Sequence, residues 1–177
     1  LGFMYKNGNG VPQNNAETVK WLQLAAEQGY ADAQSFLGFM YENGFFVLKD
    51  YIEAVKWYQL SAEQGDSSSQ FNLGTMYSNS NSVLKDYAES LKWYRLAAEQ
   101  GNAPAQSIIG GMYEFGKGAL QDNLTAHMWY NISSANGSEG AGRSRDELAD
   151  LMTADAIEKA TAMARECMKS NYKKCGY

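Results

Sequence analysis

Residues 31–65 of the chain read ADAQSFLGFMYENGFFVLKDYIEAVKWYQLSAEQG, and close copies of this stretch recur with a constant spacing of 36 residues. The copies share four tryptophans, Trp21, Trp57, Trp93 and Trp129. They also share four glycines, Gly29, Gly65, Gly101 and Gly137. No insertion interrupts the spacing, and a fixed period of this length predicts a solenoid of stacked repeats.

The first half of the quoted stretch has the pattern of an amphipathic helix. Ala33, Leu37 and Met40 follow one another at steps of four and three residues, so they share one helix face. Polar residues fill the opposite face. The pattern therefore predicts a helix over residues 31–43.

The second half carries the signals of a second helix. Asp50 is placed to act as the N-cap, and Glu53, three residues later, would complete a capping box. Gly65 is placed to end the helix, because a left-handed C-terminal turn favours glycine. The predicted buried stripe consists of Ala54, Trp57, Tyr58, Ser61 and Ala62. One helix pair cannot bury both of its apolar sides, so the sequence predicts an all-α stack of helical hairpins.

The repeated pattern AxAQxxLGxMYxxGxGVxxDYxxAxxWYxxAAxQG resembles the Sel-one-like repeat (SLR) family, a relative of the tetratricopeptide repeats. The resemblance covers essentially the whole chain. It rests on Leu37-Gly38, Met40-Tyr41, Asp50-Tyr51, Trp57-Tyr58 and Gln64-Gly65, together with their counterparts one period away. It implies a right-handed superhelical solenoid of helix-turn-helix repeats, similar to a tetratricopeptide array.

The repeats account for residues 1–137, which correspond to about four units. Leu1 falls in the middle of a first-helix pattern, so we expect the first unit to be truncated at its N-terminus. After Gly137 the period breaks. We expect residues 138–177 to form a terminal helix pair and tail of the same solenoid, because a repeat array needs a polar end for solubility.

The terminal segment predicts two further helices. The first is expected to run to Leu151, and the second from Ala154 to about Lys169 with Thr153 as its N-cap. The order RDELA, MT and AREC along this segment resembles the segment that closes many SLR arrays.

Composition excludes several classes of partner. The chain has 20 acidic and 15 basic residues and a net charge of −5, so it lacks the basic field that nucleic acid requires. No apolar run is long enough to cross a bilayer. The sequence suggests neither a metal site nor a cofactor site.

Partner recognition is expected where the repeats differ, because the recurring Trp, Tyr and Met positions should form the core. The resemblance implies that the first helix of each pair lines a concave surface that binds a protein or peptide. The candidate contact residues are Phe39, Phe71, Ser35, Thr75 and Ser107, with Glu42 and Glu114 as rim charges. Packing of Phe39 or Phe71 against a neighbouring repeat is the alternative.

Phe45 and Phe46 replace the Asn9-Gly10 pair of the first repeat. Two aromatic residues in such a connection predict a contact surface for a partner or for a second copy of the chain, and packing onto the adjacent loop is the alternative. Self-association through the N-terminal end is a further hypothesis. The polar connection over residues 78–82 is expected to be the most mobile one.

The expected function is a non-catalytic scaffold for protein interactions. A β-lactam-binding or hydrolytic enzyme, as described for some cysteine-rich relatives, is one alternative, and a self-assembling structural module is another. Ser82 with Lys85 and Ser170 with Lys173 have the S-x-x-K spacing, but S-D-N and K-T-G are missing. His127 is expected to be a partly buried structural residue, because its counterparts are apolar.

Cys167 and Cys175 are the two cysteines of the chain. The resemblance favours a disulfide between them, since many SLR proteins are exported and carry cysteines; two free thiols are the alternative. A disulfide indicates a periplasmic or secreted protein, and free thiols a cytoplasmic one. The acidic balance, the low proline content and the cysteines together favour a bacterial member of the family.

Overall fold

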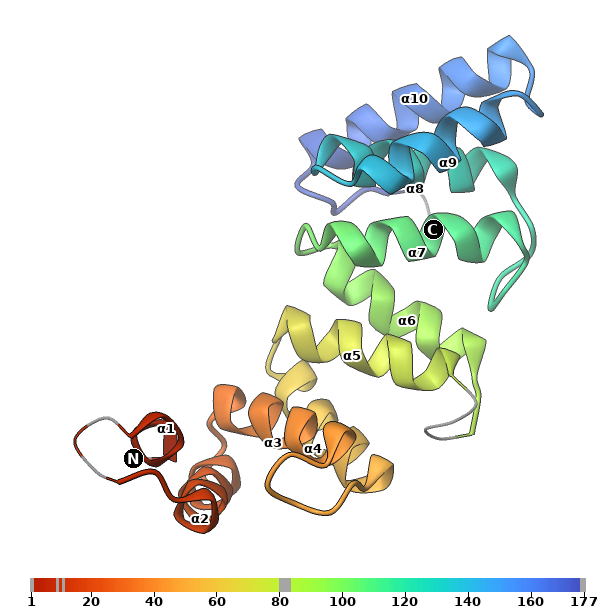
Figure 1. Ribbon diagram of the computed structural model, residues 1–177. Helices are drawn as coiled ribbons and strands as arrows, with labels where there is room; N and C mark the ends of the chain where they lie inside the picture. Colours follow the sequence, from red (N-terminus) through yellow and green to blue (C-terminus); the bar gives the residue numbers. More distant parts are fainter. Residues whose placement is uncertain (1, 9, 11, 80–83, 176–177) are drawn as a thin grey trace. The chain divides into compact units, whose positions relative to one another are not determined.

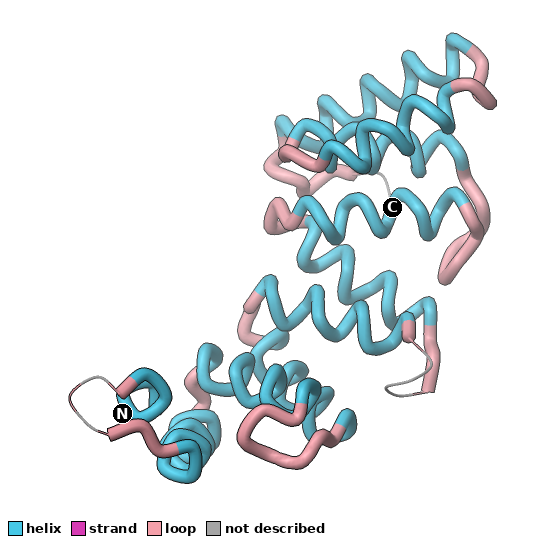
Figure 2. Tube along the Cα trace, viewed as in Figure 1, coloured by secondary structure: helices cyan, strands magenta, loops and turns pink. Residues whose placement is uncertain are grey.

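The computed structural model describes residues 2–8, 10, 12–79 and 84–175. This part of the chain consists of helices and loops and contains no strand (Figures 1 and 2), which confirms the all-α prediction. The helices are α1 (Gly2–Asn7), α2 (Asn15–Glu27), α3 (Ala31–Asn43), α4 (Tyr51–Glu63), α5 (Ser67–Ser78), α6 (Tyr87–Ala98), α7 (Ala103–Glu114), α8 (Asn123–Ala135), α9 (Glu139–Ala149) and α10 (Ala154–Lys169).

The chain divides into two compact units, residues 1–85 with α1 to α5 and residues 86–177 with α6 to α10. In the first unit each helix packs against the next one along the chain, and α3 also contacts α5. In the second unit α7 packs against α6 and α8, and α8 also contacts both α9 and α10. Consecutive helices therefore form hairpins, as the repeat pattern predicts.

Each second helix of a repeat begins at an N-cap that recurs with the period. The Asp50 carboxylate accepts hydrogen bonds from the backbone N–H groups of Ile52 and Glu53 at 2.9 and 3.1 Å. Asp86 and Asp122 cap α6 and α8 in the same way, and the Asn14 amide oxygen caps α2 by accepting from the Glu17 N–H. The predicted capping box is wrong, because the Asp50 N–H donates to the Tyr41 carbonyl oxygen and the Glu53 carboxylate accepts from Lys56 instead.

Paired helices approach each other closely at the recurring glycine that follows Leu37 in the second repeat and Ile109 in the fourth. A Cβ atom on Gly38 would lie 2.6 Å from the Tyr58 ring, and one on Gly110 would lie 2.6 Å from the Tyr130 ring. Only glycine leaves room for the tyrosine at these positions. The predicted buried stripe of α4 is confirmed, since all five of its residues are buried.

Buried glutamines connect consecutive helix pairs. Their side-chain amides donate to carbonyl oxygens in the last turn of the preceding helix, at 3.0 to 3.1 Å. The pairs are Gln34 with Ala26, Gln70 with Ala62, and Gln106 with Ala98. Each of these carbonyl oxygens also accepts a hydrogen bond from the N–H of the glycine that ends its helix, so the glutamine supplies a second bond that ties the next helix pair to the helix end.

The terminal helix pair differs in one respect from the prediction. Thr153 caps α10 as expected, since its hydroxyl accepts from the Ala156 N–H at 3.3 Å. Helix α9, however, ends at Ala149, two residues before Leu151, which is exposed. The Leu151 and Met152 N–H groups bond to Leu148 and Ala149, and this turn leads the chain into the cap.

Candidate partner-binding surface

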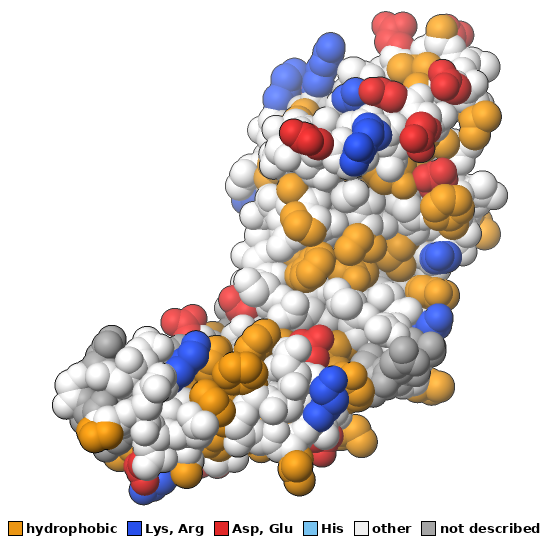
Figure 3. Space-filling view, in the orientation of Figure 1, with side chains coloured by type: hydrophobic (Ala, Val, Ile, Leu, Met, Phe, Trp, Pro, Cys, Tyr) orange, Lys and Arg blue, Asp and Glu red, His pale blue; other side chains and the backbone are white. Residues whose placement is uncertain are grey.

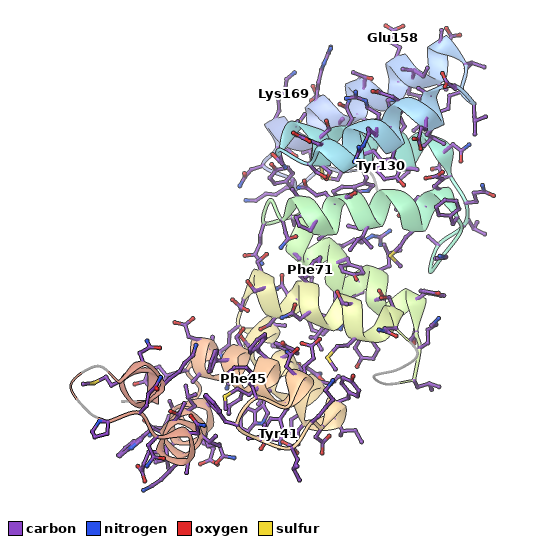
Figure 4. The ribbon with its side chains drawn as sticks, viewed as in Figure 1. Tyr41, Phe45, Phe71, Tyr130, Glu158 and Lys169 are labelled. Atoms are coloured by element: carbon purple, nitrogen blue, oxygen red, sulfur yellow. A yellow bond between two sulfur atoms is a disulfide. The ribbon has the colours of Figure 1, made fainter. Side chains whose placement is uncertain are left out.

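Four phenylalanines of the second repeat form one surface, which we call the phenylalanine cluster: Phe36, Phe39, Phe45 and Phe46. Consecutive ring centroids are 6.0, 6.3 and 4.8 Å apart. Phe39, Phe45 and Phe46 are 43%, 48% and 36% exposed. Figure 4 places Phe45 beside α3, and Figure 3 shows hydrophobic side chains gathered at this place. The sequence predicted Phe39 and the Phe45-Phe46 pair as separate contact surfaces, and the fold brings them together.

Phe46 has a backbone conformation that glycine adopts more readily. Its φ angle is 63°, whereas Gly10 and Gly118, which occupy the same position of the first and fourth repeats, both have φ of 78°. A residue with a Cβ atom is disfavoured in this region by roughly 1–2 kcal/mol. A bulky aromatic residue is thus held at a position that favours glycine.

A hollow of about 270 Å³ lies next to the cluster, between α3 and α5. We call it the α3–α5 hollow; its lining consists of Asp32, Ser35, Phe36, Phe39, Asp66, Ser68 and Asn72. The Ser35 hydroxyl donates to the Asp66 carboxylate at 3.2 Å and accepts from the Ser69 hydroxyl at 3.0 Å. These bonds fix one wall of the hollow, where the sequence predicted Ser35 as a contact residue.

Two carboxylates face this hollow. Asp66 is the N-cap of α5, and its Oδ1 accepts from the Ser69 N–H at 2.7 Å. Asp32 lies in the first turn of α3 and is exposed. Neither carboxylate forms an ion pair within the described ranges of the chain. The nearby Lys6 ammonium lies 4.3 Å from the centroid of the Phe36 ring.

Glu42 and Thr75, also predicted as contact residues, line a second hollow of about 170 Å³ in the same unit. The Glu42 carboxylate accepts a hydrogen bond from the Tyr58 hydroxyl at 2.7 Å. Burial, together with this carboxylate, raises the pKa of Tyr58 above its usual range. The Thr75 hydroxyl donates to the Phe71 carbonyl oxygen at 3.1 Å. Both side chains therefore already hold local structure.

The remaining predicted contact residues lie elsewhere. Phe71 sits half-buried on α5, where Figure 4 shows it apart from Phe45, and it lines neither of the two hollows. Ser107 and Glu114 belong to α7 in the second unit. The Glu114 carboxylate accepts from the Tyr130 hydroxyl at 2.7 Å, repeating the bond of the second repeat.

The S-x-x-K motif at Ser170 forms part of the C-terminal turn. The Ser170 hydroxyl donates to the Cys167 carbonyl oxygen at 2.7 Å and accepts from the Lys174 N–H at 2.9 Å. Ser82 of the other S-x-x-K motif lies outside the described residues. The connection predicted to be mobile, residues 78–82, is described only at residues 78 and 79. Among the residues that are described, no group of three or more His, Cys, Asp or Glu side chains is arranged to hold a metal ion.

The C-terminal tail is fixed to the second unit. Cys167 and Cys175 form a disulfide. Tyr172 lies in the segment that this disulfide closes, and its hydroxyl exchanges hydrogen bonds with the amide of Asn136, the C-cap of α8, at 2.9 and 3.1 Å. Across the described segments, no helix has the length and apolar character needed to span a membrane.

His127 is more deeply buried than the sequence suggested. It is 3% exposed, and its Nδ1 has no hydrogen-bond partner within the described structure. Burial lowers its pKa, the positive charge of Arg145 adds to the effect, and Asp146 opposes it. His127 is therefore one of the residues through which α8 contributes to the core.

Sequence reasoning missed Phe36, Asp32 and Asp66. The N-cap role of Asp66 could have been read from its place just before a helix, at a counterpart of Asn102. No sequence signal indicated that Asp32 and Asp66 share one hollow with Phe36. That proximity depends on the packing of α3 against α5.

Comparison with known proteins agrees with the repeat pattern. The family model of the Sel1 repeat matches residues 1–30, 31–66, 67–102 and 103–138. A protective antigen present in uropathogenic Escherichia coli strains, with an SLR fold, is 41% identical over 80% of this chain, with a TM-score of 0.75. A Sel1 repeat protein from Oxalobacter formigenes is 34% identical over 94% of this chain, with a TM-score of 0.74.

The matched regions differ in extent. The chain spans 30% of the length of the Escherichia coli antigen and 71% of that of the Oxalobacter formigenes protein. No curated protein shows significant similarity to the chain.

Proposed function

Since this chain belongs to the Sel1 repeat family, we propose that it is a non-catalytic scaffold that binds a protein or peptide partner on the face of its first helices. Sel1 repeats generally mediate interactions between proteins. The observation that carries the proposal is the phenylalanine cluster, an exposed apolar surface built on one helix and the loop after it. Exposed apolar patches of this kind mark sites of protein association.

Phe39, Phe45 and Phe46 are the proposed anchors of this contact. Large aromatic side chains contribute much of the binding energy at protein interfaces, because they bury a large area with few rotatable bonds. The helix that carries Phe39 is held by α2 and α4, so the receptor loses little entropy on binding. Ser35, Glu42 and Thr75 are proposed to flank this contact. Phe71 is proposed as a separate contact on α5, and Ser107 and Glu114 as another in the second unit.

We assign the protein to the periplasm or the cell exterior. The disulfide between Cys167 and Cys175 supports this location, because disulfides persist in oxidising compartments. The two relatives also favour a bacterial source.

The test compares three immobilised proteins in a pull-down from cell extract and culture supernatant. The wild type and the control variant Phe115→Ala, which removes another exposed aromatic residue, are expected to retain the same partner. The double variant Phe39→Ala/Phe45→Ala is expected to lose it while keeping the wild-type circular dichroism spectrum. A partner that all three proteins retain would contradict the assignment of the anchors.

Self-association is measured separately by light scattering over a range of protein concentrations. A dimer that forms in the wild type and dissociates in Phe39→Ala/Phe45→Ala would replace the scaffold proposal with the self-assembling module. A net charge of −5 opposes such a contact between two copies.

A further inference from the structure

The phenylalanine cluster and the α3–α5 hollow are two parts of one surface. Phe36 and Phe39 belong to both, since their rings stack in the cluster and also line the hollow. An occupant of this surface would meet aromatic rings on one side and the Asp32 and Asp66 carboxylates on the other. The surface is therefore apolar at the cluster and negatively charged at the hollow.

The described lining of the hollow holds two carboxylates and no basic side chain, and the Lys6 ammonium lies beside it, over the Phe36 ring. Neither carboxylate takes part in an ion pair within the described part of the chain. Asp66 uses Oδ1 for its bonds to Ser69 and Ser35, and its Oδ2 accepts no hydrogen bond from a described residue. Both carboxylates can thus accept hydrogen bonds from a bound cation.

The aromatic part of the surface already attracts a cation. The Lys6 ammonium lies 4.3 Å from the Phe36 ring centroid, within the range of a cation–π contact. Phe39, stacked on Phe36 and 43% exposed, offers a further ring to a cation from outside.

This combination occurs in the second repeat and is missing from the third and fourth. The counterparts of Phe36 and Phe39 are Asn72 and Thr75 in the third repeat, and Ile108 and Gly111 in the fourth. The counterparts of Asp32 are Ser68 and Pro104. The sequence period alone would not require either the rings or the carboxylate, so this surface is specific to one repeat.

From these observations we infer that the α3–α5 hollow binds an arginine side chain of the partner, next to an apolar residue that packs on Phe39 and Phe45. The inference rests on the proposed function and defines the chemistry of the segment that is bound. A guanidinium group stacks on aromatic rings with its flat face and donates paired hydrogen bonds to carboxylates with its edge. A lysine ammonium lacks this geometry and binds the same place more weakly.

The test uses a phage library of short random peptides selected on the wild-type protein. The selected peptides are expected to be enriched in an arginine that adjoins a leucine, isoleucine or aromatic residue. Fluorescence anisotropy with one such synthetic peptide then measures the arginine contribution. Replacing its arginine by glutamine is expected to weaken binding about tenfold, and replacing it by lysine about threefold.

Two variants separate the contribution of the carboxylates to binding from that of the phenylalanine rings. Asp32→Asn/Asp66→Asn removes both charges but keeps the α5 cap, because asparagine is an equally good N-cap. This variant is expected to bind the arginine peptide and its glutamine version with similar affinity. Phe39→Ala/Phe45→Ala is expected to bind neither peptide, and Phe115→Ala is expected to bind as the wild type does. Circular dichroism of each variant checks that the fold is kept.

The outcomes distinguish the two proposals. Peptides that need the phenylalanines but show no arginine preference would overturn the inference and leave the scaffold function standing. Peptides that bind Phe39→Ala/Phe45→Ala as tightly as the wild type would overturn both. If the wild-type protein selects no arginine-containing peptide from the library, that result also contradicts the inference.

Discussion

The side-chain amide of Gln34 donates a hydrogen bond to the carbonyl oxygen of Ala26 across 3.0 Å, and so connects one helix pair to the pair before it. Gln34 also accepts a hydrogen bond from the Gln64 amide at 2.6 Å. The glutamine of the repeat pattern is therefore a buried polar link between consecutive hairpins, and its recurrence at Gln70 and Gln106 has the same cause.

Replacing Gln34 by leucine is expected to destabilise the first unit by about 1–3 kcal/mol, because the Ala26 carbonyl oxygen loses one of its hydrogen bonds and the Gln64 amide loses its acceptor on Gln34. Urea unfolding followed by tryptophan fluorescence measures the change. Gln59→Ala is the control, since Gln59 is exposed and bonds only to Glu63, and its effect should stay within about 0.5 kcal/mol. Equal losses in both variants would show that Gln34 is not a structural link.

Trp57→Ala is expected to cost about 3–5 kcal/mol of stability, because Trp57 is 8% exposed and its removal leaves a large cavity. The same urea experiment measures it. Leu48→Ala serves as the control, since Leu48 lies on the surface and is almost fully exposed. A loss below about 1 kcal/mol in Trp57→Ala would mean that the helices repack around the missing ring.

Phe46 allows the backbone strain to be measured on its own. Phe46→Gly and Phe46→Ala both remove the ring, but alanine keeps a Cβ atom at a φ of 63°. The glycine variant is therefore expected to be more stable than the alanine variant by about 1 kcal/mol. Thermal unfolding of the two proteins decides the question, and equal stability would show that the loop changes conformation in the alanine variant.

His127 gives the second unit a pH-dependent stability. Because burial, and then Arg145, lowers the pKa of His127, the folded state binds fewer protons than the unfolded state as the pH falls below the usual value of about 6.5. The free energy of unfolding should therefore decrease as the pH falls from 7 to 5. His127→Leu, which restores the residue type of its counterpart Leu91, should reduce this decrease without a loss at pH 7.

Urea unfolding of the wild type and of His127→Leu at several pH values tests this prediction. Parallel pH profiles for the two proteins would mean that the carboxylates alone determine the pH dependence. Asp146 opposes the lowering of the His127 pKa. In Asp146→Asn the free energy of unfolding should therefore fall more steeply with decreasing pH than in the wild type.

The disulfide between Cys167 and Cys175 is expected to stabilise the C-terminal end by about 2–3 kcal/mol, because it closes a short ring in the unfolded chain. A reducing agent should lower the melting temperature of the wild type and leave that of Cys167→Ser/Cys175→Ser unchanged. A wild-type protein whose melting temperature does not respond to reduction would show that the Tyr172 and Asn136 hydrogen bonds hold the tail without the disulfide.

Most of the fold was predictable from the sequence because its signals are local and repeated. The N-cap at Asp50, the glycine ends such as Gly65 and the apolar stripe of α4 depend on residues within one helix or turn. The capping box was an exception. Its failure depended on Tyr41, a residue of another helix, whose carbonyl oxygen takes the Asp50 N–H.

The candidate site was less predictable, because it depends on contacts between elements. The sequence indicated Phe39, Phe45, Phe46 and Ser35 as places where the repeats differ. It assigned Phe39 and the Phe45-Phe46 pair to different surfaces, since periodicity states which helix face a residue occupies and says nothing about the course of the following loop.

The sequence by itself determined the helices, their pairing and the 36-residue period, because each follows from the spacing of apolar, capping and glycine residues along the chain. Only the tertiary structure decided that the loop returns Phe45 to Phe39, that Asp66 and Asp32 line the same hollow, and that Glu42 is bonded to Tyr58. These relationships join residues of different elements, and their distances depend on how the helices pack against one another.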